Sequence, residues 1–232
     1  ADESIYNAFF ITVARTAIQT VLNVVLTSML AYALSRREYV LRKFITTAFV
    51  LTMYVNAGLI PNYLLIQRTL GLGKSFWVYI VPTMLSCFNM IITRTYILSL
   101  PDALVESARI DGAGDFYLFW RIIFPLCTPV LATVALFVAV GAWNSWFDTH
   151  LYNAGKVYLH TLQYLLKMKL ATTTNSANAA MTSADAAAST TLTTPVTIRA
   201  AITVVSAAPI VVIYPFLQRY FVVGLNVGSV KG

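Results

Sequence analysis

Charged residues are scarce in this chain of 232 residues, because Asp, Glu, Lys and Arg together make up only 11% of it. A soluble domain carries roughly 25% charged residues. Hydrophobic residues reach 58%, and the mean hydropathy is +0.72. These values argue against a soluble globular domain and indicate that lipid surrounds most of the chain. The net charge of +7 forms no basic stripe with interleaved aromatic residues, so we expect membrane lipid and no nucleic acid as a partner.

The sequence also lacks the motifs of the common catalytic sites. It contains no G-x-x-x-x-G-K-[ST] phosphate loop, no G-x-S-x-G and no H-E-x-x-H. The Gly112-Ala113-Gly114 run has no third glycine and no preceding strand, so it is not a dinucleotide fingerprint. We therefore expect that this chain is not an enzyme, that it holds no cofactor, and that any ATP hydrolysis takes place in a partner.

Cysteine and histidine are too few and too scattered to suggest a metal site. Cys87 falls in a hydrophobic run and Cys127 at the start of another, which argues against a structural disulfide. His150 and His160 are ten residues apart, with no cysteine or carboxylate cluster beside them. We expect no metal ligand in the chain and place both histidines at the membrane interface.

Long hydrophobic runs dominate the remaining sequence. A helix crosses the hydrocarbon layer with about 20 residues, and no alternating pattern persists long enough for a barrel. The expected fold class is all-α, a polytopic transmembrane helical bundle. Its five predicted spans are residues 9–34, 44–65, 76–98, 127–147 and 196–223.

Loop charge predicts the orientation of these spans. Four cations crowd residues 36–43, which marks that loop as cytoplasmic under the positive-inside rule. Alternation then places residues 67–75 outside, residues 100–129 inside and residues 152–195 outside. Five spans leave the N-terminus outside without a targeting signal, so we expect a further helix before the first span.

Residues 100–129 form a polar island between two hydrophobic runs. They are predicted to form two short helices, with Asp102 and Asp115 as N-caps and Asp111-Gly112 as the turn that ends the first helix. Pro125 and Pro129 should end the second helix before the next span. One apolar helical face is expected from Phe116, Phe119, Trp120, Ile123 and Phe124. The island is either an ordinary polar loop or a rigid docking element for a partner protein.

The island resembles the EAA loop of bacterial ABC importer permeases. The resemblance is carried by Glu106-Ser107-Ala108, Asp111-Gly112-Ala113, Pro125-Leu126 and Pro129. The family pattern has alanine at the middle position of the triplet, where this chain has Ser107. Serine is small enough to pack similarly. The resemblance implies a cytoplasmic coupling helix that sits in a groove of the ATPase subunit. The implied coupling residues are Glu106, Ser107, Ala108, Asp111, Gly112, Ala113, Phe116 and Pro125.

Other stretches resemble the carbohydrate-uptake group of these permeases, which includes maltose and alginate-oligosaccharide importers. They are the segment from Asn7 to Arg36, the run 143–147 and the C-terminal residues 218–232. The resemblance implies a type I importer fold of six spans, with residues 1–232 as one transmembrane domain. Within it lie a coupling loop at 100–126 and an extracytoplasmic loop at 152–195. The first family helix would be missing here.

The same resemblance implies the setting and the partners of the chain. It places the chain in the bacterial inner membrane with a second homologous permease, two ATP-binding cassette subunits that bind ATP and magnesium, and an extracytoplasmic solute-binding protein. The implied function is ATP-driven import of oligosaccharides by alternating access, coupled through residues 102–124. The alternative is a secondary transporter or channel that needs no ATPase. That class uses paired ionisable groups at the bilayer midplane, and none is apparent here.

Polar and aromatic residues near the spans are candidates for the translocation pathway. Aromatic rings stack on sugar faces, and amides and carboxylates bind hydroxyls, but Trp also forms interfacial belts. The candidates are Asn89, Trp143, Asn144, Trp146 and Asp148. Three amides line the pathway or bond neighbouring helices: Asn23, Asn56 and Asn89. Three arginines near span ends are expected to extend to the interface: Arg15, Arg94 and Arg199.

The outer segment 152–195 begins with leucines at helical spacing, which predicts an amphipathic helix over 157–170. It continues into residues 171–194, rich in Ala, Ser, Thr and Asn, a composition that cannot form a core of its own. The segment is either a mobile external loop or a contact for the solute-binding protein. The exposed candidates for that contact are Gln163, Tyr164, Lys167 and Lys169.

Overall fold

The computed structural model describes residues 3–55 and 57–182, together with isolated helical positions between 197 and 211. Every regular element in this part of the chain is helical, as the sequence predicts. The span predicted at 196–223 lies largely outside the described residues. Arg199 and Asn56 lie wholly outside them. The elements are α1 (Glu3–Ser35), α2 (Arg42–Tyr54), α3 (Leu59–Leu64), η1 (Leu65–Thr69), η2 (Phe76–Tyr79), η3 (Val81–Thr83), α4 (Cys87–Ser99), α5 (Asp102–Ile110), α6 (Asp115–Leu118), η4 (Phe119–Ile123), α7 (Phe124–Leu126), α8 (Thr128–Asn144), α9 (Phe147–Tyr152), η5 (Val157–Leu159) and α10 (Leu162–Thr182).

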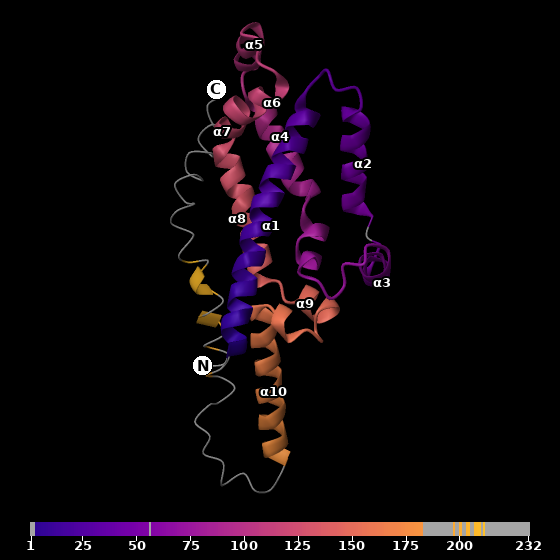
Figure 1. Cartoon of the computed structure of the whole chain (residues 1–232), viewed down its shortest axis with the longest axis vertical. Helices are drawn as coiled ribbons and strands as arrows, with labels where there is room; N and C mark the ends of the chain where they lie inside the picture. The colour runs from indigo at the N-terminus through magenta and orange to yellow at the C-terminus, as the bar shows by residue number, and fades with distance from the viewer. Residues whose placement is uncertain are drawn as a thin grey trace.

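The helix α1 runs through the length of the bundle and packs mainly against α4 and α8 (Figure 1). Its 33 residues confirm the first predicted span, and within the described residues it is the one helix long and apolar enough to cross a membrane alone. Its buried face is nevertheless polar. Five buried polar side chains recur every three or four positions along it: Thr12, Arg15, Gln19, Asn23 and Thr27.

The predicted second span, 44–65, is not one straight helix. The helices α2 and α3 meet at 118°. Between them Gly58 has φ +84°, a backbone conformation that glycine adopts readily and that other residues rarely adopt. Pro61 then sits in the first turn of α3, where its missing N–H costs nothing. A continuous apolar run therefore concealed a sharp bend.

The third predicted span is also divided. The segments Phe76–Thr83 and Cys87–Ser99 meet at 46°, because Pro82 lies in the short helix η3 and Ser86 caps the start of α4. The fourth predicted span, 127–147, is matched by the single helix α8. Residues 115–126 and 128–144 meet at 79° at Cys127, between Pro125 and Pro129, where the second island helix was expected to end before the next span. Among the described residues, length and composition allow up to four spans if each bent pair counts as one.

The main apolar core joins α1, α4 and the segment around η4. Its buried members are Ala31, Tyr32, Leu34, Met90, Ile97, Phe119, Ile123, Cys127, Val130 and Leu131. Cys87 and Cys127 are both free thiols. The core lies toward the end of the bundle that carries α5, so it supports that end from within.

The two polar segments of the sequence lie at opposite ends of the bundle (Figure 1). The helix α5 projects at one end, beside the loop between α1 and α2, and α10 projects at the other. The predicted helix over 157–170 is replaced by η5, a break at His160–Thr161, and α10. That helix continues through Thr182, further into the Ala- and Thr-rich stretch than was expected from the sequence.

Candidate functional site

The turn between α5 and α6 is built around Gly112, whose φ of +79° ends α5. The N–H of Ala113 donates to the carbonyl of Ala108 at 2.9 Å. The N–H of Gly112 donates to the carbonyl of Arg109 at 3.0 Å. These two bonds form a Schellman motif, which satisfies the last carbonyl groups of a helix. The expected role of Asp111-Gly112 in ending the first helix of the island is thus observed, with a defined geometry.

The two predicted N-caps of the island are wrong by one residue. Pro101 and Gly114 occupy the cap positions, and neither helix start has a side-chain cap hydrogen bond. Asp102 and Asp115 are instead the first residues of α5 and α6. A carboxylate there still interacts favourably with the positive end of the helix dipole, so the signal for a helix start was correct and its register was not.

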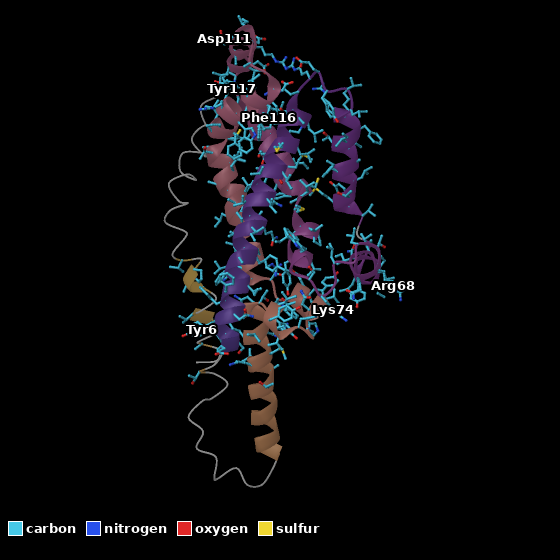
Figure 2. The ribbon with its side chains drawn as sticks, in the orientation of Figure 1. Tyr6, Arg68, Lys74, Asp111, Phe116 and Tyr117 are labelled. Atoms are coloured by element: carbon cyan, nitrogen blue, oxygen red, sulfur yellow. The ribbon has the colours of Figure 1, made fainter. Side chains whose placement is uncertain are left out.

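The end of the bundle formed by α5 and α6 exposes large apolar side chains (Figure 2). Ile110 is 87% exposed, Phe116 is 70% exposed and Tyr117 is 57% exposed. We call Ile110, Phe116 and Tyr117 the tip residues. Ile110 and Tyr117 were not among the residues predicted from the sequence, although an isoleucine directly before an Asp-Gly turn indicates an apolar side chain beside that turn. An exposed apolar group of this kind is typical of an interaction surface.

The expected single apolar face of the second island helix is divided between core and solvent. Phe119 and Ile123 are buried, whereas Phe116 and Trp120 are exposed. The cause is a π-helical turn at Phe119–Ile123, which changes the helical register. Four pairs of aromatic rings remain in contact here, with centroids 5.0–6.3 Å apart: Phe116–Trp120, Phe119–Trp120, Phe119–Phe124 and Trp120–Phe124. The tip is therefore joined to the core by aromatic contacts.

The remaining residues of the predicted coupling set are arranged by burial. Ala108 is buried and Ala113 half-buried, so both face the bundle. The exposed members are Glu106, Ser107, Asp111, Gly112 and Pro125. Ser107 Oγ donates to the carbonyl of Ala103 at 2.7 Å, so the hydroxyl at the departing position is satisfied within α5. Serine therefore fits this position without an unpaired polar group.

Arg109 ties α5 to the end of α1. Its guanidinium binds both carboxylate oxygens of Glu38, in the loop between α1 and α2, and reaches Asp115 Oδ1 at 3.3 Å. We call Arg109, Glu38 and Asp115 the arginine clamp. The hydrogen bond from Arg109 lowers the pKa of Glu38. A bidentate guanidinium–carboxylate pair fixes geometry as well as charge, so the clamp holds the island in register with α1.

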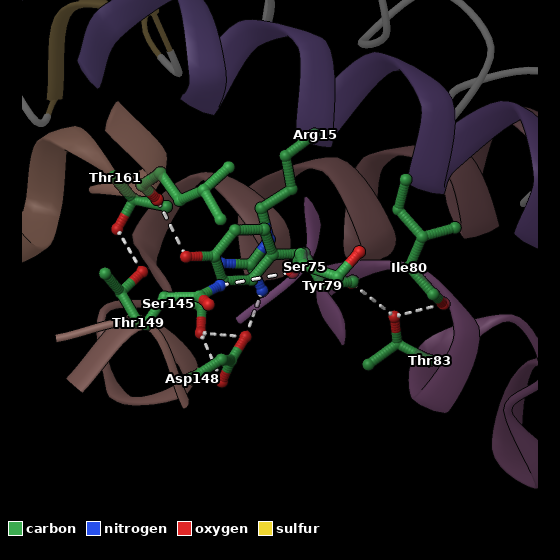
Figure 3. A network of polar contacts seen from close by, with 11 residues as sticks. Arg15, Ser75, Tyr79, Ile80, Thr83, Ser145, Asp148, Thr149 and Thr161 are labelled. Atoms are coloured by element: carbon green, nitrogen blue, oxygen red, sulfur yellow. Dashed lines mark hydrogen bonds and ion pairs between the residues drawn. The ribbon is translucent and has the colours of Figure 1, made fainter. Parts of the chain in front are cut away.

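A second arginine lies on α1 beside α9, away from the arginine clamp (Figure 3). Arg15 is 1% exposed and forms an ion pair with Asp148, which also accepts a hydrogen bond from Ser145. Its guanidinium carbon lies 4.7 Å from the centroid of the Tyr79 ring. The expectation that Arg15 extends to the interface is wrong, because this partner within the protein compensates its burial. Asp148 is likewise held by Arg15 rather than free for a pathway.

Further polar contacts surround this pair (Figure 3). The hydroxyl groups of Thr149 and Thr161 lie 2.9 Å apart, and Asn153 Nδ2 donates to the carbonyl of Ser75 at 3.2 Å. Tyr79 Oη donates to the carbonyl of Leu159 at 2.8 Å. These bonds join the segments around η2, α9 and η5 to one another, and the Arg15–Asp148 pair attaches them to α1.

The predicted pathway residues are not brought together. Trp143 is buried and stacks edge-on against Phe9, with centroids 6.1 Å apart. Asn144 is exposed and its amide donates to its own helix, at the carbonyl of Val140. Lys167 lies over the ring of Trp146. The sequence left two roles open for these tryptophans, a platform for a sugar ring or a residue of the membrane interface. A sugar platform needs an uncovered ring face.

Asn89 lines a cavity between α1, α4 and α8. Its Nδ2 donates to Asn23 Oδ1 at 3.3 Å, and Asn23 Nδ2 donates to the carbonyl of Thr83 at 2.9 Å. The two amides thus bond neighbouring helices and also line the cavity. Arg94 Nε donates to the carbonyl of Leu34 at 3.0 Å, so it too binds within the bundle.

The four residues predicted to contact a binding protein differ in exposure. Lys167 and Lys169 are exposed, and Gln163 is half-buried. Tyr164 is only 5% exposed and packs against His150 and His160, so the expectation that it is exposed is wrong. It falls on the face of α10 that turns toward α9, which the leucine spacing alone did not reveal.

Comparison with known proteins bears directly on this arrangement. Residues 23–227 match the family model described as "binding-protein-dependent transport system inner membrane component". The polygalacturonan/rhamnogalacturonan transport system permease protein YtcP of Bacillus subtilis is 35% identical over 232 residues, which is 100% of this chain and 79% of that protein. The protein LplC of the same organism is 37% identical over 229 residues, covering 97% of this chain and 72% of that protein.

A solved structure is similar as well. It comes from a crystal structure described as a bacterial ABC transporter involved in the import of the acidic polysaccharide alginate. The TM-score is 0.80 at 29% identity, over 95% of this chain and 76% of that chain. The chain therefore belongs to the family of binding-protein-dependent transport system inner membrane components, the permease subunits of ABC importers.

Proposed function

We propose that this chain forms half of the translocation pathway of an ATP-driven importer of oligosaccharides and couples to a cytoplasmic ATPase through residues 102–124. The observation that carries the proposal is the exposed turn at Gly112, which presents Ile110, Phe116 and Tyr117 at the end of the bundle. The turn is rigid, because a Schellman motif closes it and the arginine clamp holds it. A rigid projection can transmit a displacement, whereas a flexible loop would absorb it.

The partners follow from the family and from the shape of the two ends. The proposal requires two ATP-binding cassette subunits, which bind ATP and magnesium, beneath the α5 end. It requires a second homologous permease beside the bundle and a solute-binding protein at the α10 end. Saccharide as the substrate class is supported by the names of relatives, because YtcP is a polygalacturonan/rhamnogalacturonan permease and the similar structure belongs to an alginate importer.

The mechanism is alternating access. Closure of the ATPase dimer displaces α5 and α6, and the clamp at Glu38 passes that displacement to α1. Because α1 packs against both α4 and α8, its movement reorients the helices that line the pathway. Membership of a binding-protein-dependent family favours this mechanism over a secondary transporter or channel that works without an ATPase.

The test compares two glycines of the same turn in the complete reconstituted importer. Gly112→Val places a β-branched residue at φ +79°, a conformation that costs roughly 1–2 kcal/mol or more outside glycine. Gly114→Ala is the matched control, because Gly114 has φ −73° and an added Cβ would meet nothing within 4 Å. We expect Gly112→Val, and separately Glu106→Lys, to retain ATP hydrolysis while uptake per ATP falls about tenfold.

Three results decide the outcome. Gly114→Ala should behave as the wild type in both uptake and ATP hydrolysis. Normal uptake by both Gly112→Val and Glu106→Lys would contradict the coupling role of the island. Failure of an ATPase subunit to co-purify with the wild-type chain would contradict the proposal as a whole.

A further inference from the structure

A cavity of about 420 Å³ opens between α1, the start of α4 and α8. Its lining includes Gln19 and Asn23 from α1, Asn89 from α4, and Phe137 and Gly141 from α8. Gln19 is the central residue of the 33-residue α1, so the cavity lies halfway along the helix that matches the first predicted span. Amide side chains within a membrane span are costly and are commonly functional.

Gln19 supplies an unused acceptor at this cavity. Its side chain is 7% exposed, and its Oε1 is buried with no hydrogen-bond partner. Asn23 and Asn89 differ, because they bond each other and the carbonyl of Thr83. A buried unsatisfied acceptor in a native protein calls for a partner outside the chain, and a hydroxyl group is the simplest donor that fits an amide oxygen.

Aromatic rings border the same cavity. Phe137 lines it and is 46% exposed, and its ring centroid lies 6.4 Å from that of Phe88, which is 51% exposed. The C–H face of a sugar ring packs on such an aromatic surface while its hydroxyls need hydrogen-bonding groups. The sequence predicted an aromatic ring beside hydrogen-bonding groups at Trp143 and Trp146, but Trp143 is buried and Lys167 lies over Trp146. An exposed ring beside amide groups occurs at this cavity instead.

The lining residues, as far as the structure describes them, include no charged side chain. The basic residue one turn away on α1 is Arg15, which is already paired with Asp148. A carboxylate placed in this cavity would lack a cation to offset its lost hydration. The site therefore suits hydroxyl groups and ring faces rather than the carboxylates of an acidic sugar.

We propose that this cavity is a saccharide subsite of the translocation pathway, in which Gln19 accepts a hydrogen bond from a sugar hydroxyl and Phe137 packs against the ring. The subsite recognises a saccharide unit by its uncharged groups. Its volume lies within the roughly 300–1,000 Å³ of small-molecule sites. The inference rests on the proposed function, because it assigns a ligand to the pathway of a sugar importer.

The first experiment fills the cavity without altering its hydrogen bonds. A Cβ added at Gly141 would meet nothing within 4 Å, so Gly141→Leu extends into open space. Gly155→Leu is the matched control, because Gly155 also has open space around it and does not line the cavity. The complete importer with its binding protein is reconstituted in liposomes, and uptake of labelled maltotriose and trigalacturonate is measured beside ATP hydrolysis.

We expect Gly141→Leu to lower uptake of whichever probe the wild type carries by about tenfold or more, with ATP hydrolysis stimulated by the binding protein retained. Gly155→Leu should match the wild type. Uptake by Gly141→Leu within twofold of the wild type would overturn the subsite. Loss of the companion permease from purified Gly141→Leu complex would also overturn it, because the cavity would then be a contact between subunits.

The second experiment removes the acceptor alone. Gln19→Met has a similar length and no amide oxygen, so uptake should fall about fivefold at unchanged ATP hydrolysis. Thr20→Val is the control, because Thr20 Oγ1 is also buried and unpaired on α1 but does not line the cavity. Equal uptake by Gln19→Met and Thr20→Val would exclude the hydroxyl contact.

These outcomes separate the two proposals. If the wild-type complex carries neither probe, nor any other oligosaccharide offered with its binding protein, the proposed function fails and the subsite fails with it. If the wild type imports a saccharide and the cavity variants import it equally well, the subsite alone is wrong.

Discussion

The two arginine–carboxylate sites of this bundle use similar side chains in contrasting environments. Arg15 is 1% exposed, and two of its guanidinium nitrogens, Nε and Nη1, have no hydrogen-bond partner. Arg109 is 36% exposed and binds two carboxylates. The first pair is enclosed by the protein, whereas water solvates the second. Burial therefore assigns them different tasks: Arg15 holds α1 and α9 together, and Arg109 adjusts the position of a projecting helix.

The largest effect is expected where a charge would be left buried without a partner. Asp148→Asn leaves the guanidinium of Arg15 enclosed and unneutralised, which costs about 3–5 kcal/mol for a buried pair. Arg15→Met removes the buried charge and leaves Asp148, which is 28% exposed and retains its bond from Ser145, so the cost should be about 1.5–3 kcal/mol. The midpoint of thermal unfolding of the purified complex should therefore be lower for Asp148→Asn than for Arg15→Met.

A reversed order of these two midpoints would contradict the contrast between the sites, since it would mean that water reaches Arg15. Ser145→Ala serves as the control, because it removes a hydrogen bond to Asp148 without changing either charge. Its midpoint should lie between those of Arg15→Met and the wild type.

An intermediate effect, on transport and not on stability, is expected at the exposed site. Arg109→Lys keeps the charge but cannot bind both oxygens of Glu38 while also reaching Asp115. Exposed ion pairs contribute little to stability, so the unfolding midpoint should stay unchanged. Uptake per ATP should fall about threefold, since the tip would move without carrying α1.

Arg121→Lys is the matched control for this experiment, because Arg121 is exposed on the neighbouring π-helical turn and lies outside the arginine clamp. Uptake per ATP should be unaffected by it. An equal loss in Arg109→Lys and Arg121→Lys would indicate a general need for positive charge and would remove the specific role of the clamp.

The smallest effect concerns pH at the same clamp. The hydrogen bond from Arg109 lowers the pKa of Glu38 from its ordinary value of 4.5. A group with a lowered folded pKa contributes stability that is present above its unfolded pKa and is lost as pH falls through the folded pKa. The difference in unfolding midpoint between the wild type and Glu38→Gln should thus be small and constant from about pH 8 to 6 and shrink as the pH falls below the ordinary pKa of 4.5.

A difference between the wild type and Glu38→Gln that stays constant or grows as the pH falls below 4.5 would contradict this account. Asp102→Asn is the control for general acid effects, because Asp102 is also an exposed carboxylate at the start of α5 and lies outside the clamp. Its difference from the wild type should not follow the same pH profile.

Local sequence signals predicted the island better than they predicted the spans. Gly112 ends α5 because only its backbone accommodates φ +79° readily, and that preference is visible in one residue. The bends within residues 44–65 and 76–98 were less visible, because hydropathy measures the apolar length of a run and carries no direction. Pro61 and Pro82 were the available signals, but proline is frequent in membrane helices and so discriminates poorly.

For the site residues as well, the sequence indicated chemical type better than it indicated neighbours and burial. Asn89 was selected as a polar group in a span, and it does line a cavity, yet the other amides of that lining, Asn23 and Gln19, lie 66 and 70 positions earlier in the chain. The polar residues at Thr12, Gln19, Asn23 and Thr27 form a stripe at helical spacing, which would have revealed a buried polar face on α1. Trp143 was selected for its chemistry, but a chemical type does not specify whether a ring is covered.

The sequence by itself determined that lipid surrounds this protein, that its fold is helical and that a turn forms at Gly112. Apolar content, helical periodicity and backbone preference determine these features because they act over a few neighbouring residues. The tertiary structure alone decided which polar groups are paired and which remain available. Arg15 meets Asp148 across 133 positions, and Arg109 meets Glu38 across 71. Such pairs depend on how helices pack and bend, and packing is set by contacts between segments that are distant in the chain.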